Sequence, residues 1–330
     1  MPIVTQQEDS VLHIPAQVIP VPSSISTQGQ AFLANAAKRI AALSAGGGPS
    51  PTNLAEQAAA ALAFLRPMAS RFSGTFETIA LPHGALLYWV TPEGREGRKA
   101  DISLLDIHGG GWSTGGGEMC QLLAKLRAAD YGVEVYALDY RLAPEHPFPA
   151  ALDDCIAAYR EILSHCKAAD LIVSGASAGG NLAAGLMLRA RDEGLPLPAG
   201  LILMTPATDM TLAGDSIQTN RFLDVTLYGG AEAARDDYAA SHDYTDPYLS
   251  PLFGDFTKGW PPTILTSGTR DLLLSDTVRM HRALRRAGVT AELHVAEASP
   301  HGGFMGSAPE DAELLAECRR FMYAAWGVEG

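Results

Sequence analysis

The chain has 330 residues, of which 47% are hydrophobic and 18% are charged, a balance that is ordinary for a soluble globular protein with a large core. Its 37 acidic residues outnumber its 24 basic ones and give a formal net charge of −13. A negative charge of this size argues against nucleic acids and anionic membranes as partners.

The N-terminal residues and the cysteines bear on the compartment. The start MPIVTQQEDSVLHIPAQVIP has no basic residues followed by an apolar core, so we expect no secretory signal peptide. No uncharged apolar run approaches the roughly 18–20 residues that a membrane-spanning helix needs. The four cysteines show no C-x-x-C spacing, and we expect free thiols rather than disulfides. These features together predict a cytoplasmic protein.

The chain up to about residue 69 is rich in alanine and predicts two helices, at Gln30–Leu43 and Asn53–Phe64, joined by the loop SAGGGPSPTN. From Thr75 onward strands alternate with helices. The predicted strands cover residues 75–81, 84–90, 100–108, 133–139, 170–175, 200–205, 262–268 and 291–297. The predicted helices cover Met119–Tyr131, Ala150–Cys166, Ala178–Arg191, Thr277–Ala287 and Glu310–Tyr323. This alternation predicts an α/β fold with a mostly parallel sheet covered by helices on both faces.

One interval breaks the alternation. Residues Ala207–Gly259 separate two predicted strands where a single helix would suffice, and an insertion of this length is usually a lid or a binding element. Right-handed crossovers place ligands beyond the carboxyl ends of the parallel strands. We therefore expect the functional residues in the loops that follow the strands.

The stretch LIVSGASAGGNLAAGLML places Ser177 between a short apolar strand and an alanine-rich helix. Gly175 and Gly179 flank the serine at the spacing G-x-S-x-G, the nucleophile elbow that exposes a serine hydroxyl at the top of an α/β sheet. Any tight strand–helix turn would also favour serine and glycine, so this motif alone leaves a packing role open.

A second motif, DIHGGGWSTGGGE, begins at the end of the strand predicted at residues 100–108. Three consecutive glycines, Gly109, Gly110 and Gly111, cost backbone entropy and are poorly explained as a linker. Their N–H groups are suited to holding a developing oxyanion, as in the HGGG loop of lipases and esterases. A phosphate-binding loop is the rival interpretation, but neither G-x-G-x-x-G nor a Walker pattern is present.

Taken together with DYRLAPEHPFPAALDD, PYLSPL, SGTRDLLLSD and SPHGGF, these motifs resemble the hormone-sensitive-lipase-like esterases of the α/β-hydrolase superfamily. The resemblance runs in order from about residue 75 to the C-terminus. It implies an α/β-hydrolase domain over residues 70–330, with a cap made of the helical segment 1–69 and the insertion at about 207–259. The proline-rich segment after Asp139 is interpreted as a loop that supports the site.

The acid and the base should follow the nucleophile in chain order. Asp271 lies just after a predicted strand, at the position of the family's triad carboxylate, and His301 lies in a Pro- and Gly-rich loop after the last predicted strand. Asp276 is the rival acid, although it could equally serve in the first turn of a helix. Two positions depart from the family pattern: Ser275 replaces an acidic residue, and Ala176 replaces the aspartate that often precedes the nucleophile.

The resemblance implies a serine carboxylic-ester hydrolase that acts on small esters or lactones with short acyl groups. Ser177, His301 and Asp271 would form the triad, and the N–H groups of Gly109, Gly110 and Ala178 the oxyanion hole. Trp112, Phe222 and Tyr228 are candidate walls of the substrate pocket. No cofactor and no metal is expected, since no metal-ligand spacing such as H-E-x-x-H occurs.

Two other interpretations stay open at this point. A peptidase or amidase would share the triad chemistry. A non-catalytic small-molecule receptor on the same fold would be expected to lack the base, and His301 argues against it. The sequence also leaves a homodimer open and does not identify the natural ester.

Overall fold

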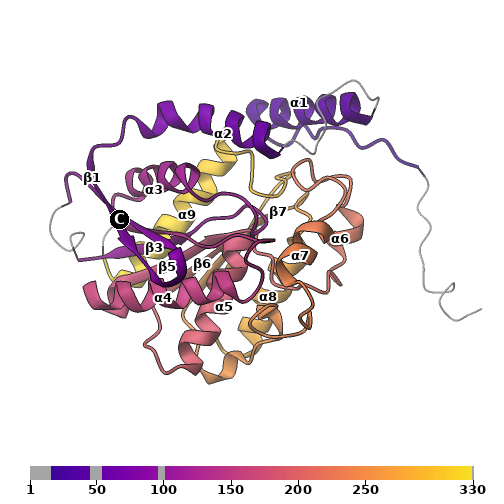
Figure 1. The fold of residues 1–330 in the computed structure, drawn as a ribbon. Helices are drawn as coiled ribbons and strands as arrows, with labels where there is room; N and C mark the ends of the chain where they lie inside the picture. Colours follow the sequence, from indigo (N-terminus) through magenta and orange to yellow (C-terminus); the bar gives the residue numbers. More distant parts are fainter. Residues whose placement is uncertain (1–15, 45–53, 96–100, 329–330) are drawn as a thin grey trace, which may run out of the picture.

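The computed structural model describes residues 16–44, 54–95 and 101–328, which form a single eight-stranded sheet with helices around it (Figure 1). The strands are β1 (Gly74–Ala80), β2 (Leu86–Pro92), β3 (Ser103–Ile107), β4 (Glu134–Asp139), β5 (Leu171–Ala176), β6 (Gly200–Met204), β7 (Thr263–Gly268) and β8 (Ala291–Ala296). Their order across the sheet is β1-β2-β4-β3-β5-β6-β7-β8. Each strand predicted from the sequence is present.

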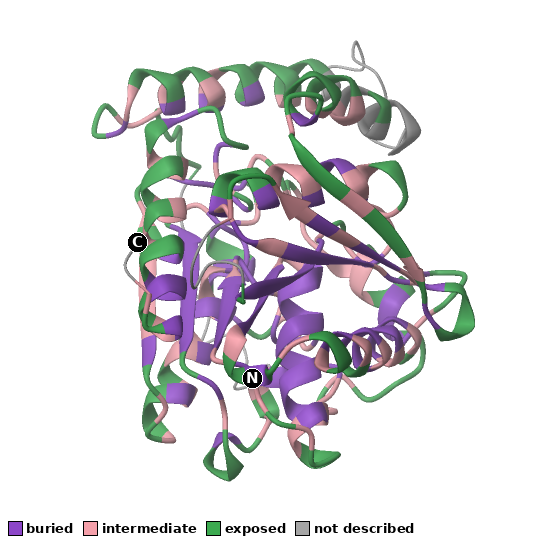
Figure 2. Cartoon of the chain, turned by 90° about the vertical axis from the view of Figure 1, so that its left-hand side faces the viewer, coloured by how far each residue is buried: buried purple, intermediate pink, exposed green. Residues whose placement is uncertain are grey.

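The strand pairing is antiparallel between β1, β2 and β4 and parallel from β4 to β8. The central strands β3 and β7 are buried along their whole length, and Figure 2 shows the middle of the sheet as buried. Continuous apolar runs such as LILM and TILT suit strands that are covered on both faces. The prediction of a mostly parallel, doubly covered sheet is confirmed.

Helices cover both faces of the sheet. The helices α3 (Glu118–Tyr131) and α9 (Pro309–Trp326) pack on one face, and α4 (Ala150–His165), α5 (Ala178–Asp192) and α8 (Leu274–Arg286) pack on the other (Figure 1). Each face has its own hydrophobic core, one that includes Leu105, Tyr159 and Leu186 and one that includes Val135 and Phe321. Since the parallel strands are joined through these helices, their carboxyl ends lie at one edge of the sheet.

The N-terminal segment contains α1 (Thr27–Ser44) and α2 (Leu54–Ala69), so both predicted helices are present. The loop predicted between them falls on residues 45–53, outside the described residues. Helix α2 packs on α3, whereas Leu33 of α1 packs in a small cluster with Ala298 and Phe304. The loop that contains His301 is therefore covered by the N-terminal segment.

The insertion at 207–259 contains only short helices: α6 (Ser216–Thr219), α7 (Glu232–Ala239), η5 (Pro251–Phe253) and η6 (Phe256–Lys258). Further 3-10 turns lie at η2 (Pro82–Gly84) and η4 (Ala168–Asp170). All four cysteines are free, as the sequence predicts. Within the described ranges, no helix has the length and apolar character needed to cross a membrane.

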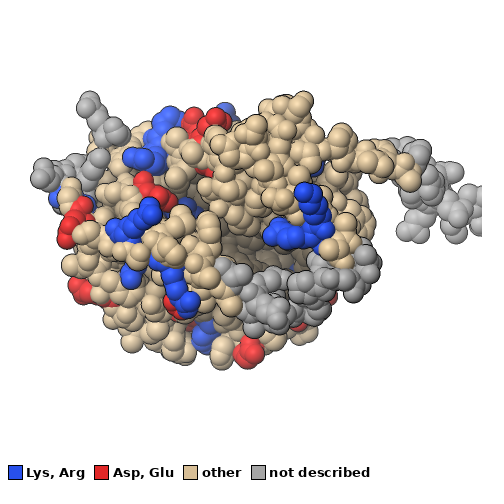
Figure 3. All heavy atoms as spheres, turned by 90° about the horizontal axis from the view of Figure 1, so that it is seen from above, with Lys and Arg blue, Asp and Glu red and all other residues tan. Residues whose placement is uncertain are grey.

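The surface has no extended patch of one charge on the face drawn in Figure 3. Lysine and arginine side chains are interspersed with acidic ones among the described residues on that face.

Candidate active site

Ser177 lies at a sharp turn between β5 and α5, where it adopts φ 56° and ψ −119°. A positive φ is unfavourable for a residue with a Cβ, so the surrounding packing must hold this turn. Gly179 contributes to that packing, because a Cβ on it would lie 2.0 Å from the carbonyl oxygen of Ile107. The first turn of α5 can therefore approach the end of β3 closely enough to present the Ser177 hydroxyl at the sheet edge.

The glycine loop after β3 lies directly against this turn. A Cβ on Gly109 would be 3.3 Å from the Cβ of Ser177, and Gly110 adopts φ 117°, which a residue with a side chain rarely reaches. In the described part of the chain, the N–H groups of Gly109, Gly110 and Ala178 have no acceptor. The loop thus brings Gly109 close to the serine, and Ala178, which follows the serine directly, carries a further unused donor.

His108 fixes the conformation of the glycine loop. Its Nδ1 lies 2.7 Å from the carbonyl oxygen of Gly109, and its ring stacks on Tyr140 with centroids 4.2 Å apart. Burial lowers the pKa of His108, so the ring is neutral near pH 7 and its Nδ1–H donates to Gly109. Because a trans peptide directs its N–H away from its carbonyl, this bond turns the N–H of Gly110 away from His108.

The side chains of Ser177, His301 and Asp271 form a continuous hydrogen-bonded series. The Nε2 of His301 lies 2.8 Å from the Oγ of Ser177, and its Nδ1 lies 2.9 Å from the Oδ1 of Asp271. Asp271 is fully buried and also accepts hydrogen bonds from the Ser267 hydroxyl at 2.6 Å and the Leu273 N–H at 2.9 Å. An acceptor-only carboxylate places the proton on Nδ1, which leaves Nε2 free to accept from the serine.

Opposing effects act on the titration of His301. Burial lowers the pKa of the imidazole, while the charges of Asp271 and Asp224 and the hydrogen bond to Asp271 raise it, and the net pKa lies above its ordinary value. The protonated form of the His301 ring is therefore stabilised in this position, which would suit a group that accepts a proton.

Asp276 does not contact His301. It lies in the first turn of α8, where its Oδ2 accepts the N–H of Thr208 at 2.8 Å and the N–H of Asp209 at 3.0 Å. Burial, with the charge of Asp209, raises the pKa of Asp276 to about 7. This carboxylate holds the start of the insertion rather than the imidazole.

The chain is similar to known hydrolases. Residues 104–305 match the family model described as the alpha/beta hydrolase fold. An acetyl-hydrolase of Streptomyces hygroscopicus is 35% identical over 203 residues, which are 61% of this chain and 66% of that protein. An esterase of Acinetobacter venetianus is 34% identical over 223 residues, covering 66% of this chain and 73% of that protein.

Solved structures extend the similarity over almost the whole chain. The crystal structure of esterase E25 superimposes with a TM-score of 0.82 at 34% identity, covering 94% of this chain and 98% of that one. An esterase from the bacterial hormone-sensitive lipase family gives a TM-score of 0.77 at 28% identity, covering 91% and 99%. The chain belongs to the hormone-sensitive-lipase-like esterases of the α/β-hydrolase superfamily. It is a carboxylesterase by these relationships, and we call it the esterase below.

The insertion of the esterase supplies residues that the sequence did not single out. Ser216 donates its hydroxyl to the carbonyl oxygen of Leu272, and Asn220 donates its amide to the carbonyl oxygen of Asp271. Asp224 accepts the N–H of Leu272. The only trace of this arrangement in the sequence is the spacing of four residues between these polar side chains.

Ser275, one of the positions at which the esterase departs from its family pattern, also contacts the insertion. Its hydroxyl accepts the N–H of Ser216 at 2.9 Å, and its own N–H donates to the Ser216 hydroxyl at 2.8 Å. A Cβ on Gly214 would lie 2.6 Å from the Cβ of Ser275, so a small residue fits this position.

The three aromatic residues considered as pocket walls lie in different environments. Trp112 is buried, and its ring stacks on Tyr238 of α7 with centroids 4.6 Å apart and an interplanar angle of 2°. Phe222 and Tyr228 are 65% and 45% exposed and contact each other edge to face. Trp112 thereby joins the glycine loop to the insertion, while Phe222 and Tyr228 lie at the surface of the insertion.

The segment after Asp139 contacts the glycine loop, in keeping with its supporting role. The N–H of Ala143 donates to the carbonyl oxygen of Trp112 at 2.9 Å. Arg141 forms a salt bridge of 2.8 Å with the fully buried Asp154 at the start of α4. The start of this segment is thus held against both the glycine loop and α4.

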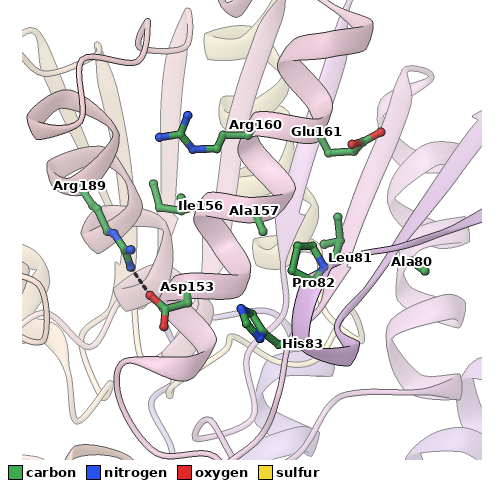
Figure 4. A pocket seen from close by; sticks show the side chains of 10 residues that line it. All are labelled: Ala80, Leu81, Pro82, His83, Asp153, Ile156, Ala157, Arg160, Glu161 and Arg189. Carbon is green, nitrogen blue, oxygen red and sulfur yellow. Dashed lines mark hydrogen bonds and ion pairs between the residues drawn. The ribbon is translucent and has the colours of Figure 1, made fainter.

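A cleft of about 490 Å³ lies away from these residues (Figure 4). It is formed by the end of β1, η2, α4 and α5, and none of the predicted site residues lines it. Its two arginines already have carboxylate partners, since Arg189 binds Asp153 and Arg160 binds Glu193. Neither guanidinium is left for a ligand.

Proposed function

We propose that the esterase hydrolyses small carboxylic esters or lactones with short acyl groups, using Ser177 as nucleophile, His301 as general base and acid, and Asp271 as the carboxylate that orients His301. The observation that carries this proposal is the series of hydrogen bonds of 2.8 Å and 2.9 Å from Ser177 through His301 to Asp271. A receptor without catalysis would have no use for a base within hydrogen-bond distance of a strained serine.

In the first half of the reaction, the Oγ of Ser177 attacks the ester carbonyl carbon while Nε2 of His301 takes the hydroxyl proton. The imidazolium that forms is stabilised by Asp271, and its proton is then delivered to the leaving alcohol. The second half repeats these transfers with water as the nucleophile, which releases the carboxylic acid and restores Ser177.

The developing oxyanion would be held by the N–H groups of Gly109, Gly110 and Ala178. The support for this assignment is that these donors lack acceptors among the described residues, that Gly109 lies against Ser177, and that Ala178 follows Ser177 directly. Donors of this kind are worth about 3–4 kcal/mol each in the transition state of acyl transfer.

Helices α1 and α2 of the N-terminal segment would form the cap over the substrate together with the insertion 207–259. The support for this cap is that α1 contacts Phe304, close in the chain to His301, and that Trp112 of the glycine loop stacks on Tyr238 of the insertion. A bounded pocket limits the length of the acyl group, and the similarity to an acetyl-hydrolase favours a short one. Trp112, Phe222 and Tyr228 are the proposed walls.

A series of aryl esters of graded acyl length, with aliphatic lactones included, tests the substrate class. We expect kcat/KM to favour acyl chains of about two to six carbons over chains beyond about twelve. A preference for the longest chains that increases at an oil–water interface would instead indicate a lipase. Turnover of an anilide at a rate comparable to that of the matching ester would favour an amidase.

A further inference from the structure

The carboxylate of Asp224 lies in the insertion, between the loop that contains Asp271 and the loop that contains His301. Its Oδ2 accepts the N–H of Leu272, the residue after Asp271, at 2.7 Å. The N–H of His301 itself lies 3.3 Å from Oδ2 and 3.4 Å from Oδ1, a long and bifurcated contact. One side chain of the insertion thus contacts the backbone of both loops.

Asp224 also accepts hydrogen bonds from residues of its own turn. The N–H groups of Thr226 and Leu227 lie 2.9 Å and 3.1 Å from Oδ1 and anchor the side chain to its own turn. Four N–H groups therefore converge on a fully buried carboxylate. A carboxylate accepts at both oxygens, whereas an asparagine would turn an NH₂ group against some of these donors.

The charge of Asp224 also reaches the imidazole. A carboxylate oxygen of Asp224, a carboxylate oxygen of Asp271 and a ring nitrogen of His301 all lie within 4.8 Å of one another. Asp271 and Asp224 are the two charged groups that raise the pKa of His301 against its burial. Burial raises the pKa of Asp224 above its ordinary value, and the charge of His301 and the N–H of Leu272 oppose that effect.

The neighbouring polar residues of the insertion do not share this position. Ser216 and Asn220 bind carbonyl oxygens of the loop that contains Asp271, and Ser216 also bonds to Ser275 at the start of α8. No hydrogen bond joins either side chain to the loop that contains His301 among the described residues. Of these three residues, only Asp224 carries a charge and accepts hydrogen bonds from both loops.

We propose that Asp224 is a positioning residue. It joins the insertion to the loop that contains Asp271 and to the loop that contains His301, and it keeps His301 in place between Asp271 and Ser177. This inference rests on the proposed Ser177–His301–Asp271 mechanism. It gives the insertion a role in the chemistry besides covering the substrate.

The test compares the parent enzyme with Asp224→Asn, with Asp224→Ser as a second variant that also removes the charge. We expect kcat to fall by about 10- to 100-fold with little change in KM, because misplacement of a base by about 1 Å has costs of this order. Loss of one negative charge near His301 should also move the acidic limb of kcat/KM to lower pH, by up to about one unit.

Asp311→Asn is the matched control, since Asp311 accepts the N–H of Phe304 in the same loop and is not among the groups that shift the His301 pKa. It should lower the melting temperature and leave the acidic limb where it is. A folded, charge-free Asp224 variant with the parent's kcat and acidic limb would overturn the proposal.

Ser177→Ala, measured in the same assays, separates the two proposals. If that variant retains the parent's activity, the mechanism itself is wrong. If it is inactive and the Asp224 variants behave like the parent, only the role of Asp224 fails.

Discussion

Asp271 lies 2.9 Å from Nδ1 of His301, while Asp276, five positions later in the chain, binds the N–H groups of Thr208 and Asp209 instead. Asp271→Asn should therefore lower kcat by about 10⁴, the cost of the wrong imidazole tautomer in the serine-protease precedent. Asp276→Asn keeps an oxygen acceptor for both N–H groups and should retain most of the activity. Steady-state kinetics of the two variants decide between the acids, and the reverse order of activity would contradict our assignment.

Gly179 provides a test of the close packing beneath the nucleophile. Gly179→Ala would place a methyl group 2.0 Å from the Ile107 carbonyl oxygen, a clash with backbone that no side chain can relieve. We expect a loss of at least about 3 kcal/mol of stability, together with most of the activity. Gly29→Ala in α1 is the control, because its nearest neighbour is the flexible end of Ile25 at 3.2 Å. Thermal denaturation with equal losses in both variants would refute this account of the elbow.

The stack of Trp112 on Tyr238 should matter to the glycine loop. Tyr238→Ala removes a fully buried ring, and we expect a loss of about 3–5 kcal/mol with a lower kcat. Tyr238→Phe keeps the ring and removes a buried hydroxyl that has no partner among the described residues, so it should be neutral or slightly stabilising. Urea denaturation and kcat of the pair provide the check. A Tyr238→Phe variant as damaged as Tyr238→Ala would point to a role for the hydroxyl.

The glycine loop and the nucleophile turn could be predicted because both are short motifs in which the conformation dictates the residues. The mostly parallel sheet and the helices on both of its faces could be predicted from the alternation of strands and helices. Asp224, Ser216 and Asn220 could not be predicted, because their partners in the loop that contains Asp271 lie 48 to 56 positions away in the chain.

Element ends were predicted less well, for identifiable reasons. Helix α2 was expected to end at Phe64 but continues to Ala69, although Pro67 in its last turn has no N–H to donate to the carbonyl oxygen four residues before it. Helix α8 begins at Leu274 rather than Thr277. The side chain of Asp276 in its first turn binds Thr208 and Asp209 rather than its own helix, a contact with no signature in the sequence.

The pH dependence follows from the raised pKa of His301. Burial opposes this rise, but the Asp271 carboxylate and its hydrogen bond outweigh burial and stabilise the charged ring. Since the charged ring cannot accept the Ser177 proton, activity should increase through one ionisation at a pH above about 6.5 and then reach a plateau. We also expect no effect of a chelator on kcat/KM between pH 5 and 9. An optimum below pH 5, or inactivation by the chelator, would contradict this mechanism.

The central claim is that the hydroxyl of Ser177 is the nucleophile, and covalent labelling tests it most directly. An organophosphate reacts readily only with an activated serine, so we expect one adduct per chain, on the peptide that contains Ser177, with loss of activity in proportion to labelling. The variants Ser177→Ala and His301→Ala should take up no label, since one lacks the hydroxyl and the other lacks the base. An adduct on a different residue, or full activity in Ser177→Ala, would contradict the account.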